Sequence, residues 1–396
     1  MKWASAISTQ PRFRAALDET IEAVTRQLEG GVPDLVITFM TREFGASYAR
    51  LVGLLRTAWP DAVLFGCSAS GVIGAGHEIE AQPAISLTAA VLPGVAIRSV
   101  HLESSELPPV YAERHAWESA LGIKAATDPQ FIVIGDPFSF DAEGFLRGLD
   151  RAFPASTKVG GLASGALEAG GNLLLLGEKA YSTGAIVLGL CGNLRIDTVV
   201  AQGCRPVGEP FFVTSCHGNL LRELDGRTPR DVLAQLFERL SARDRALVEQ
   251  SLFIGLALPG EHSAIKAGDF LIRNVIGMDA QSGALWVGAE LEPNGVVQFH
   301  LRDALSSAED LERALAQAGS RAPRPSGALL FSCVGRGARL YGSPDHDSNV
   351  LRRHLGELPI GGFFCAGEIG PVQGMSQVHG YTSAVAIITP QTYTPQ

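Results

Sequence analysis

The sequence predicts an α/β (mixed α+β) protein with two domains of mixed sheets and flanking helices. Three observations predict this class. Of the 396 residues, 46% are hydrophobic and 18% are charged, so a large core can form. Apolar strand-like runs alternate with amphipathic helix-like runs. The same order of elements returns three times along the chain, which indicates an internal repeat.

The first repeat begins after an amphipathic helix at 12–28, which Gly30 and Gly31 end. Its elements are an apolar strand, a helix before Pro60, a second strand, a glycine-rich loop and a third strand. We expect these elements at 34–40, 47–58, 62–66, 67–80 and 84–92.

The same order of strand, helix, glycine-rich strand end and closing strand returns twice. The second repeat has these elements at 131–136, 142–153, 158–171 and 184–191, and the third at 327–333, 349–356, 361–374 and 381–389. The strand-end loops are similar in letters: GCSASGVI, GGLASGAL and FCAGEIGP. A helix between two strands favours a parallel crossover, and a glycine-rich turn favours an antiparallel neighbour, so we expect mixed sheets.

Between the second and third repeats the pattern changes to a helix-rich stretch at 229–250, several strands with hairpin-type turns, and a helix at 307–318. A boundary near Leu221 divides the chain into comparable halves. We therefore predict two domains, residues 1–220 and residues 221–396.

Charge and composition exclude several classes of function. The net charge is −9 and no basic run occurs, so nucleic acid and anionic membrane surfaces are not expected partners. No apolar run approaches the roughly 18 residues that span a bilayer, and the start has no signal-peptide core. The six cysteines are scattered, which favours free thiols in a reducing cytoplasm.

Several motifs resemble one family. The N-terminal half, with FGCSASG, VGGLASG and AQGCRPVGEPFFVT, resembles a FIST N domain. The C-terminal half, with GALLFSCVGRG, LYG, GGFFCAGEIGPV and HGYTSAVA, resembles a FIST C domain. The resemblance covers nearly the whole chain.

The resemblance implies a bacterial sensory protein that binds a small ligand, with amino acids as the suggested class, and that does not catalyse a reaction. Because no kinase, chemoreceptor or cyclase domain is evident, a separate signalling protein such as a histidine kinase is the expected partner. A second implication is haem-based nitric-oxide sensing, for which no axial ligand can be selected. We expect no metal site and no other cofactor.

The three glycine-rich loops are the first candidate for a binding cavity. Ligands of open α/β sheets bind where loops leave the carboxyl ends of strands. If the repeats pack around one centre, three segments converge there: Cys67 with Ser68, Leu162 to Gly165, and Cys365 to Glu368. The alternative is that the glycines only permit tight turns.

Cys333 and Arg336 end the first strand of the third repeat, and Glu368 follows its second strand. An arginine with a glutamate suits a zwitterion, because guanidinium binds carboxylate and a carboxylate binds ammonium. The alternative is a structural Arg336–Glu368 salt bridge.

Three more residues are candidates for ligand binding. Arg205 is a second cation beside a cysteine, with packing as the alternative. His379 and Thr382 flank the last strand and could line the same cavity, although a half-buried structural histidine is the other interpretation.

An enzyme is the main competing hypothesis. Cys67, Cys333 or Cys365 could act as the nucleophile of a hydrolase for a small amide or ester, with a histidine as base. No thiol-enzyme signature surrounds them. The three repeats are also similar to those of ring-opening amidohydrolases, which implies a serine–lysine pair in each repeat. Ser70 and Ser164 occur, but the third repeat has no lysine, which disfavours that mechanism.

Overall fold

A computed structural model of the chain describes residues 1–258, 270–319 and 324–391. The chain forms two spatial units. One, here called the three-sheet unit, contains Met1–Ala201 and Leu311–Gln396. The other, the barrel unit, contains Gln202–Asp310. The predicted boundary at 220/221 falls within strand β15 (Leu220–Leu224) of the barrel unit, so the spatial units differ from the predicted division along the chain.

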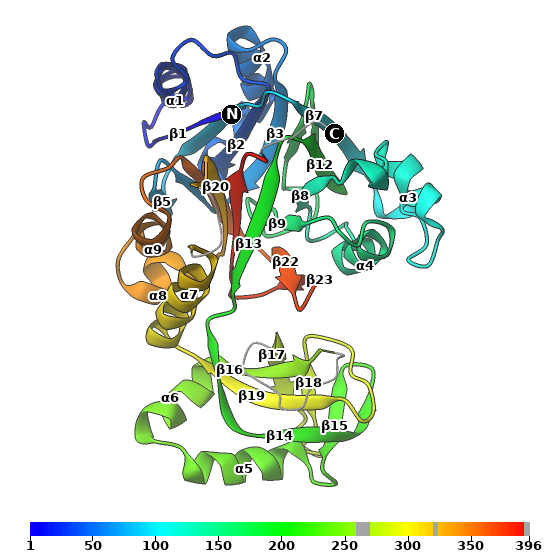
Figure 1. Cartoon of the computed structure of the whole chain (residues 1–396). Helices are drawn as coiled ribbons and strands as arrows, with labels where there is room; N and C mark the ends of the chain where they lie inside the picture. The colour runs from blue at the N-terminus through cyan, green and yellow to red at the C-terminus, as the bar shows by residue number, and fades with distance from the viewer. Residues whose placement is uncertain (259–269, 320–323, 392–396) are drawn as a thin grey trace. The chain divides into compact units, whose positions relative to one another are not determined.

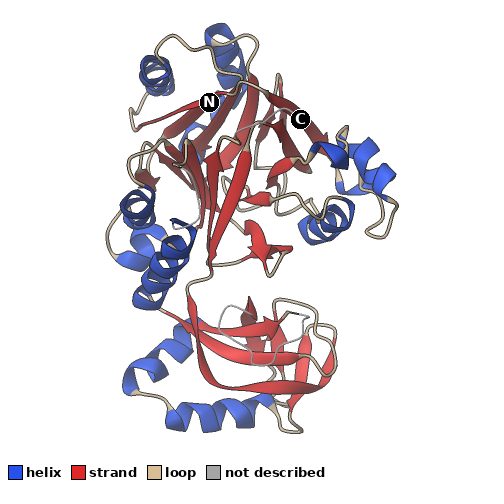
Figure 2. Cartoon of the chain, in the orientation of Figure 1, coloured by secondary structure: helices blue, strands red, loops and turns tan. Residues whose placement is uncertain are grey.

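Three six-stranded sheets build the three-sheet unit, and all are mixed, as predicted (Figures 1 and 2). The first has the order β1 (Lys2–Ser8), β6 (Ile85–Val91), β2 (Leu35–Thr41), β3 (Val63–Ala69), β10 (Leu174–Leu176) and β11 (Lys179–Tyr181). The second has β7 (Val95–Leu102), β12 (Ala185–Gly192), β8 (Gln130–Gly135), β9 (Lys158–Leu162), β22 (Glu368–Val372) and β23 (Met375–His379). The third has β13 (Arg195–Ala201), β24 (Ser383–Thr389), β20 (Gly327–Cys333), β21 (Ile360–Cys365), β4 (Gly71–Gly74) and β5 (His77–Glu80).

The three sheets have the same plan. Each holds four strands of one repeat, with a parallel central pair such as β2 and β3. A two-stranded hairpin from a different repeat completes each sheet. The hairpin after β3 joins β21, the hairpin after β9 joins β3, and the hairpin after β21 joins β9. The first hairpin lies within the predicted loop at 67–80, the second follows the predicted loop at 158–171, and the third begins in the predicted loop at 361–374 and extends beyond it. Together the hairpins pass from repeat to repeat in a ring.

One glycine recurs at the same register position in the second strand of each repeat. Gly66, Gly160 and Gly362 have φ of +157°, +152° and +145°. A Cβ at any of them would overlap the carbonyl oxygen of its neighbour in the parallel strand: Thr38, Val133 or Leu330. Only glycine fits these positions, so part of the glycine content lies within strands rather than in loops.

Helices cover the outer faces of the sheets (Figure 2). Helices α1 (Phe13–Leu28) and α2 (Tyr48–Ala58) cover the first sheet, and α3 (Arg114–Leu121) and α4 (Ala142–Ala152) cover the second. Helices α7 (Ala304–Gly319) and α9 (His346–Leu355) cover the third, and the short helix α8 (Gly337–Tyr341) precedes α9. At α4 the local sequence fixes the start of the helix: the Asp141 side chain accepts the Gly144 N–H at 2.9 Å and caps it.

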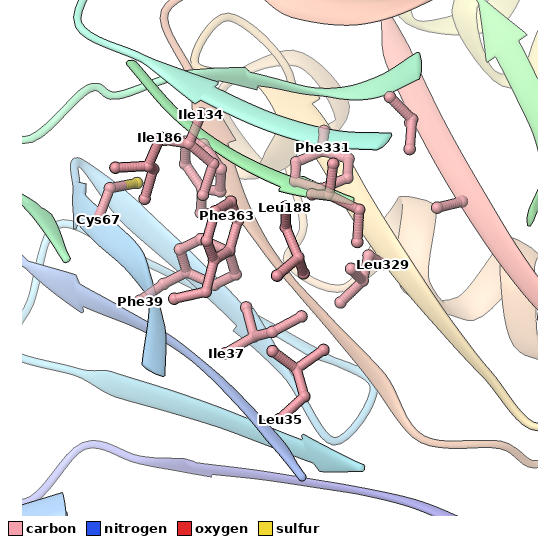
Figure 3. Close-up of a cluster of buried hydrophobic side chains, with 14 of the residues drawn as sticks. Leu35, Ile37, Phe39, Cys67, Ile134, Ile186, Leu188, Leu329, Phe331 and Phe363 are labelled. Carbon is pink, nitrogen blue, oxygen red and sulfur yellow. The ribbon is translucent and has the colours of Figure 1, made fainter. Parts of the chain in front are cut away.

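The inner faces of the three sheets share one core. Figure 3 shows side chains from all three sheets packed together, and Phe363 stacks on Phe39 at 4.6 Å between ring centroids. Phe331 meets the same ring edge-on at 5.8 Å. Burying each such side chain contributes roughly 1.5–3 kcal/mol, so the core holds the three repeats together.

The barrel unit is a closed barrel with helices α5 (Pro229–Arg239) and α6 (Ala242–Ser251). Its strands are β14 (Cys204–His217), β15, β18 (Leu285–Val287), β17 (Phe270–Met278), β16 (Leu252–Ala257) and β19 (Val296–Arg302). Within the described ranges, every helix of the chain is too short or too polar to cross a membrane.

Candidate functional site

The three glycine-rich loops converge, as the argument from a common centre predicts. The Ser70 N–H donates to Ser164 Oγ at 3.0 Å, and Ser164 Oγ in turn donates to the carbonyl of Phe364. The Leu162 N–H donates to the Gly367 carbonyl at 2.7 Å. Each repeat thus contributes to one junction of hydrogen-bonded loops, which we call the loop junction.

Glycine permits this close approach at two positions. A Cβ on Gly161 would overlap Cys365 Sγ, and a Cβ on Gly165 would overlap the Ser68 side chain. Ser68 is buried, and its Oγ accepts the Leu173 N–H at 2.9 Å, which fixes the start of β10. The loops at the junction are closely packed against one another.

The three predicted cysteines of the junction are buried. Cys333 and Cys365 are register partners on the parallel strands β20 and β21. Burial raises the pKa of the Cys67 and Cys365 thiols well above the ordinary value, and the neighbouring Glu368 raises that of Cys365 further. Both side chains are therefore thiols at neutral pH, which is the less nucleophilic form.

Arg336 forms an ion pair with Asp347, a residue outside both the zwitterion site and the alternative Arg336–Glu368 salt bridge. The guanidinium is fully buried; its Nε lies 2.8 Å from Asp347 Oδ2 and its Nη2 lies 3.2 Å from Oδ1. Nη2 also donates to the Tyr341 hydroxyl at 2.5 Å, and Nη1 donates to the Tyr381 carbonyl at 3.4 Å. All three nitrogens of the guanidinium are thus engaged within the protein.

The Asp347 carboxylate sits at the first turn of α9. It also accepts a hydrogen bond from Ser383 Oγ at 2.5 Å, and His346 Nδ1 lies 3.0 Å from its Oδ1. Burial alone raises the pKa of Asp347, but the Arg336 charge and these hydrogen bonds outweigh it and hold the pKa well below its usual range. The pair is therefore ionised throughout the physiological range.

Glu368, His379 and Thr382 lie together at the open end of the hairpin β22–β23, where Glu368 begins β22, His379 ends β23 and Thr382 follows. Glu368 and His379 are register partners, and Glu368 Oε2 accepts the Thr382 N–H at 3.0 Å. His379 Nε2 lies 3.0 Å from the Gly370 carbonyl oxygen. The Thr382 carbonyl accepts the Cys333 N–H at 3.0 Å, so these residues join the third repeat's first strand to the junction.

Arg205 lies elsewhere, in strand β14 of the barrel unit. Its guanidinium donates to Asp244, and its Nε lies 3.9 Å from Asp303. Eight of the nine predicted binding residues are therefore buried in the three-sheet unit, and the ninth is a partly exposed ion-pair residue of the barrel.

A surface depression of about 370 Å³ lies beside the edge strand β5. It lies between the β1–α1 connection and that strand, and its lining includes Ser8, Gln10, Pro11, Glu19, His77 and Ile79. Ser8 Oγ donates to Glu19 Oε2 at 2.5 Å. The volume is in the range that small ligands occupy.

Comparison with known proteins gives the family. Residues 34–227 match the FIST N domain and residues 230–371 match the FIST C domain. This chain belongs to the FIST family. FIST domains are associated with small-ligand sensing in signal transduction.

Relatives of this FIST protein align along nearly the whole chain. An uncharacterized protein of Mycobacterium tuberculosis strain H37Rv is 33% identical over 389 residues, covering 98% of this chain and 99% of the relative. An uncharacterized protein of Mycobacterium bovis is 32% identical over 388 residues, covering 98% of both chains. Among solved structures, a cyanuric acid hydrolase from A. caulinodans aligns over 99% of this chain and 100% of its own, with 10% identity and a TM-score of 0.34.

Haem, the minority expectation for this FIST protein, needs an imidazole or thiolate that opens on a cavity. His379 and Cys365 have 3% and 0% of their surface exposed, and both pack against protein atoms. They do not fit a haem ligand in this packing. Among the described residues, no group of three or more histidine, cysteine or acidic side chains could hold a metal ion.

Sequence reasoning missed two buried carboxylates, Asp347 and Asp136, that accept hydrogen bonds from the polar side chains around them. Asp347 is one, since the predicted helix begins at 349 while α9 begins at His346 and turns Asp347 inward. Asp136 is another: its Oδ1 accepts from Asn172 Nδ2 at 2.9 Å and its Oδ2 from Ser139 Oγ at 2.6 Å. Asp136 follows the first strand of the second repeat, at the position that Cys333 has in the third repeat. This equivalence could have identified Asp136 from the sequence.

Proposed function

We propose that the protein is a non-catalytic sensor that binds an amino acid or a similarly small metabolite in the cytoplasm, and that a separate signalling protein such as a histidine kinase reads its state. The FIST family's association with small-ligand sensing supports the first part. Among the described residues, which include all six cysteines, no disulfide is formed, and this is consistent with a reducing compartment.

The observation that carries the proposal is the loop junction. Every repeat contributes a loop, and hydrogen bonds of Ser164 and Leu162 connect the three. The second repeat's loop bonds to both of the others, so displacing it breaks its bonds to each of them. A ligand that separates the loops therefore changes all three sheets at once, which is the behaviour a sensor needs.

Within the junction, Glu368 is proposed as the acceptor for a ligand ammonium group. The Thr382 N–H would hold its other oxygen in place, and Cys67, Ser68, Cys333, Cys365 and His379 would surround the ligand. For Arg336 we propose a positioning role. Its nitrogens already donate to Asp347 and to the Tyr381 carbonyl, so it would hold these groups in place beside the site and would not bind the ligand itself.

The close packing at Gly161 and Gly165 sets the mode of binding. A ligand can enter only when the loops move apart, so binding and conformational change are one event. This predicts slow association, well below the typical protein–protein range of about 10⁵–10⁷ M⁻¹s⁻¹, because the opening step precedes binding.

The test is a thermal-shift screen of the twenty amino acids and related small metabolites, followed by calorimetry on any compound that binds. We expect one class to raise Tm in the wild type and in the control Glu357→Gln, an exposed carboxylate that pairs with Arg352. Glu368→Gln should weaken binding at least tenfold, since an amide cannot neutralise an ammonium group. Binding unaffected by Glu368→Gln would remove that residue from the site.

The competing hydrolase is tested in the same samples. A sensor shows a ligand-dependent shift and no turnover of small amides or esters, and its buried Cys67 and Cys365 resist iodoacetamide. Turnover that iodoacetamide abolishes would overturn the proposal in favour of the enzyme. A stable kinase complex that no small molecule affects would also overturn it.

A further inference from the structure

We propose that strand β5 is a proton-controlled latch on helices α8 and α9, closed while Glu78 carries a proton and released when Glu78 ionises. β5 belongs to the first repeat but lies at the edge of the third sheet. Within the described residues it pairs with β4 alone. Its attachment to the helices is therefore made by side chains.

Alternate residues of β5 make that attachment. Glu78 Oε1 accepts the Ser348 N–H at 2.7 Å in the first turn of α9, and the Glu78 N–H donates to Asp345 at 2.6 Å. Glu80 Oε1 accepts the Ala338 N–H at 2.8 Å in the first turn of α8. Two glutamates of one short strand thus cap two helices of another repeat.

Glu78 is the critical contact because of its surroundings. Its side chain is 3% exposed, and within the described part of the chain its Oε2 has no hydrogen-bond partner. The Ser348 N–H donates its hydrogen bond to Glu78, and the residue before Ser348 is Asp347, which the ion pair with Arg336 keeps ionised. An ionised Glu78 would therefore place a second, uncompensated negative charge beside a buried carboxylate, which is costly in a dehydrated interior.

Charged and titratable groups lie on β5 itself and on each element that its side chains contact. They are His77 and Glu80 on β5, Asp345 before α9, His346, Asp347 and Arg352 on α9, and Arg336 and Tyr341 at α8. His77 Nδ1 lies 3.0 Å from Asp345, Arg336 forms an ion pair with Asp347, and Arg352 forms one with Glu357, so these basic side chains contact carboxylates other than Glu78.

The titration of Glu78 gives the direction of the switch. Burial, and then repulsion by Asp347, raise its pKa to about 8, against an ordinary value of about 4.3. The folded state therefore binds a proton that the unfolded chain releases. The cost to stability begins near the unfolded pKa, grows as pH rises, and is complete above the folded pKa. The released proton goes to solvent.

The latch adjoins the surface depression. His77 and Ile79, which alternate with Glu78 and Glu80, line that depression. A small molecule in the depression would contact one face of β5 and the Glu78 proton lies on the other, so both would act on the same strand. That molecule would occupy a site other than the loop junction of the proposed function, and the latch itself needs no ligand.

The experiment uses the full chain without ligand. Tm is measured between roughly pH 5 and pH 9 for the wild type, Glu78→Gln and the matched control Glu80→Gln, which replaces the other capping carboxylate of the same strand by an amide. We expect Glu78→Gln to equal the wild type near pH 5 and to exceed it by about 3 °C or more at pH 9, because the amide cannot ionise. Glu80→Gln should keep most of the wild-type pH dependence.

Hydrogen exchange supplies a readout that holds even if Glu78→Gln folds poorly. In the wild type, exchange at the Ser348 and Glu78 amides should rise between pH 6 and pH 9 by more than intrinsic chemistry predicts, relative to amides of β2. Equal pH profiles for wild type and Glu78→Gln, or unchanged relative exchange, would overturn the latch. Neither result depends on a ligand, so failure here leaves the proposed function standing, and a failed ligand screen leaves the latch standing.

Discussion

At the scale of single residues, the buried Arg336–Asp347 pair shows how context decides a partner. Both side chains are essentially unexposed, at 0% and 1%. A buried ion pair gives little net stability over a hydrophobic pair, but removing one member leaves the other charge without compensation. The pair therefore acts less as a source of stability than as a constraint on where β20, α8 and α9 can sit.

Asp347→Asn should lower the free energy of unfolding by about 3–5 kcal/mol, because the Arg336 guanidinium would remain buried without a neutralising charge. Urea unfolding followed by circular dichroism measures it. The control is Asp18→Asn, which breaks the exposed pair of Asp18 with Arg14 and should cost under about 1 kcal/mol. Equal costs for the two variants would mean that Arg336 finds another partner.

The sequence pointed to residues that lie in and beside the loop junction, but not to Asp347, the partner of Arg336. Arg336, Glu368, Cys365 and Thr382 were recognisable because they follow strand ends rich in glycine. Their partners were not, since a shift of three residues in the start of α9 decides whether Asp347 faces the core or solvent. Helix starts are the least certain feature of a sequence pattern, and here the site depends on one.

At the scale of elements, the positive-φ glycines show why the central strands tolerate no side chain at one position. Gly362→Ala should cost at least about 2 kcal/mol, because its Cβ would overlap the Leu330 carbonyl at a φ that L residues rarely adopt. Gly53→Ala is the control: Gly53 lies in α2 with nothing near its Cβ, so alanine should stabilise by about 0.5–1 kcal/mol. Thermal unfolding of both variants tests this, and a neutral Gly362→Ala would contradict it.

Long elements were predictable and short exchanged ones were not. The helices α1, α2 and α4 and the strands β2, β8 and β20 follow from apolar spacing over many residues. The hairpins β4–β5, β10–β11 and β22–β23 have strands of three to five residues, too short for a periodic signal. Each hairpin pairs with a strand of another repeat, and the sequence of the hairpin does not indicate which repeat that is.

At the scale of the whole molecule, the barrel unit is an insertion in the third repeat, between β13 and β20. The two ends of the insertion lie close together: the Gly203 N–H donates to Asp310 at 2.8 Å, and Ser307 Oγ donates to the Gly203 carbonyl at 2.9 Å. Insertions whose ends meet in this way interrupt a fold without altering it.

Replacing residues 203–309 with a short glycine–serine linker should therefore leave the three-sheet unit folded. We expect strand-rich circular dichroism and one cooperative transition in the shortened protein, and a folded barrel when residues 202–310 are expressed alone. The matched comparison is residues 1–220 alone, which lack β20–β24 and should not fold, because two of the three sheets are then incomplete. A folded 1–220 fragment would contradict the ring of exchanged hairpins.

That ring of hairpins also has an evolutionary consequence. A single repeat presents one open sheet edge and one hairpin that its own sheet cannot use. Three identical copies would satisfy each other as a symmetric trimer with closed threefold symmetry. Fusion of three copies into one chain keeps the same strand pairing while freeing each copy to diverge, which is how a symmetric ancestor can acquire one junction with three different loops.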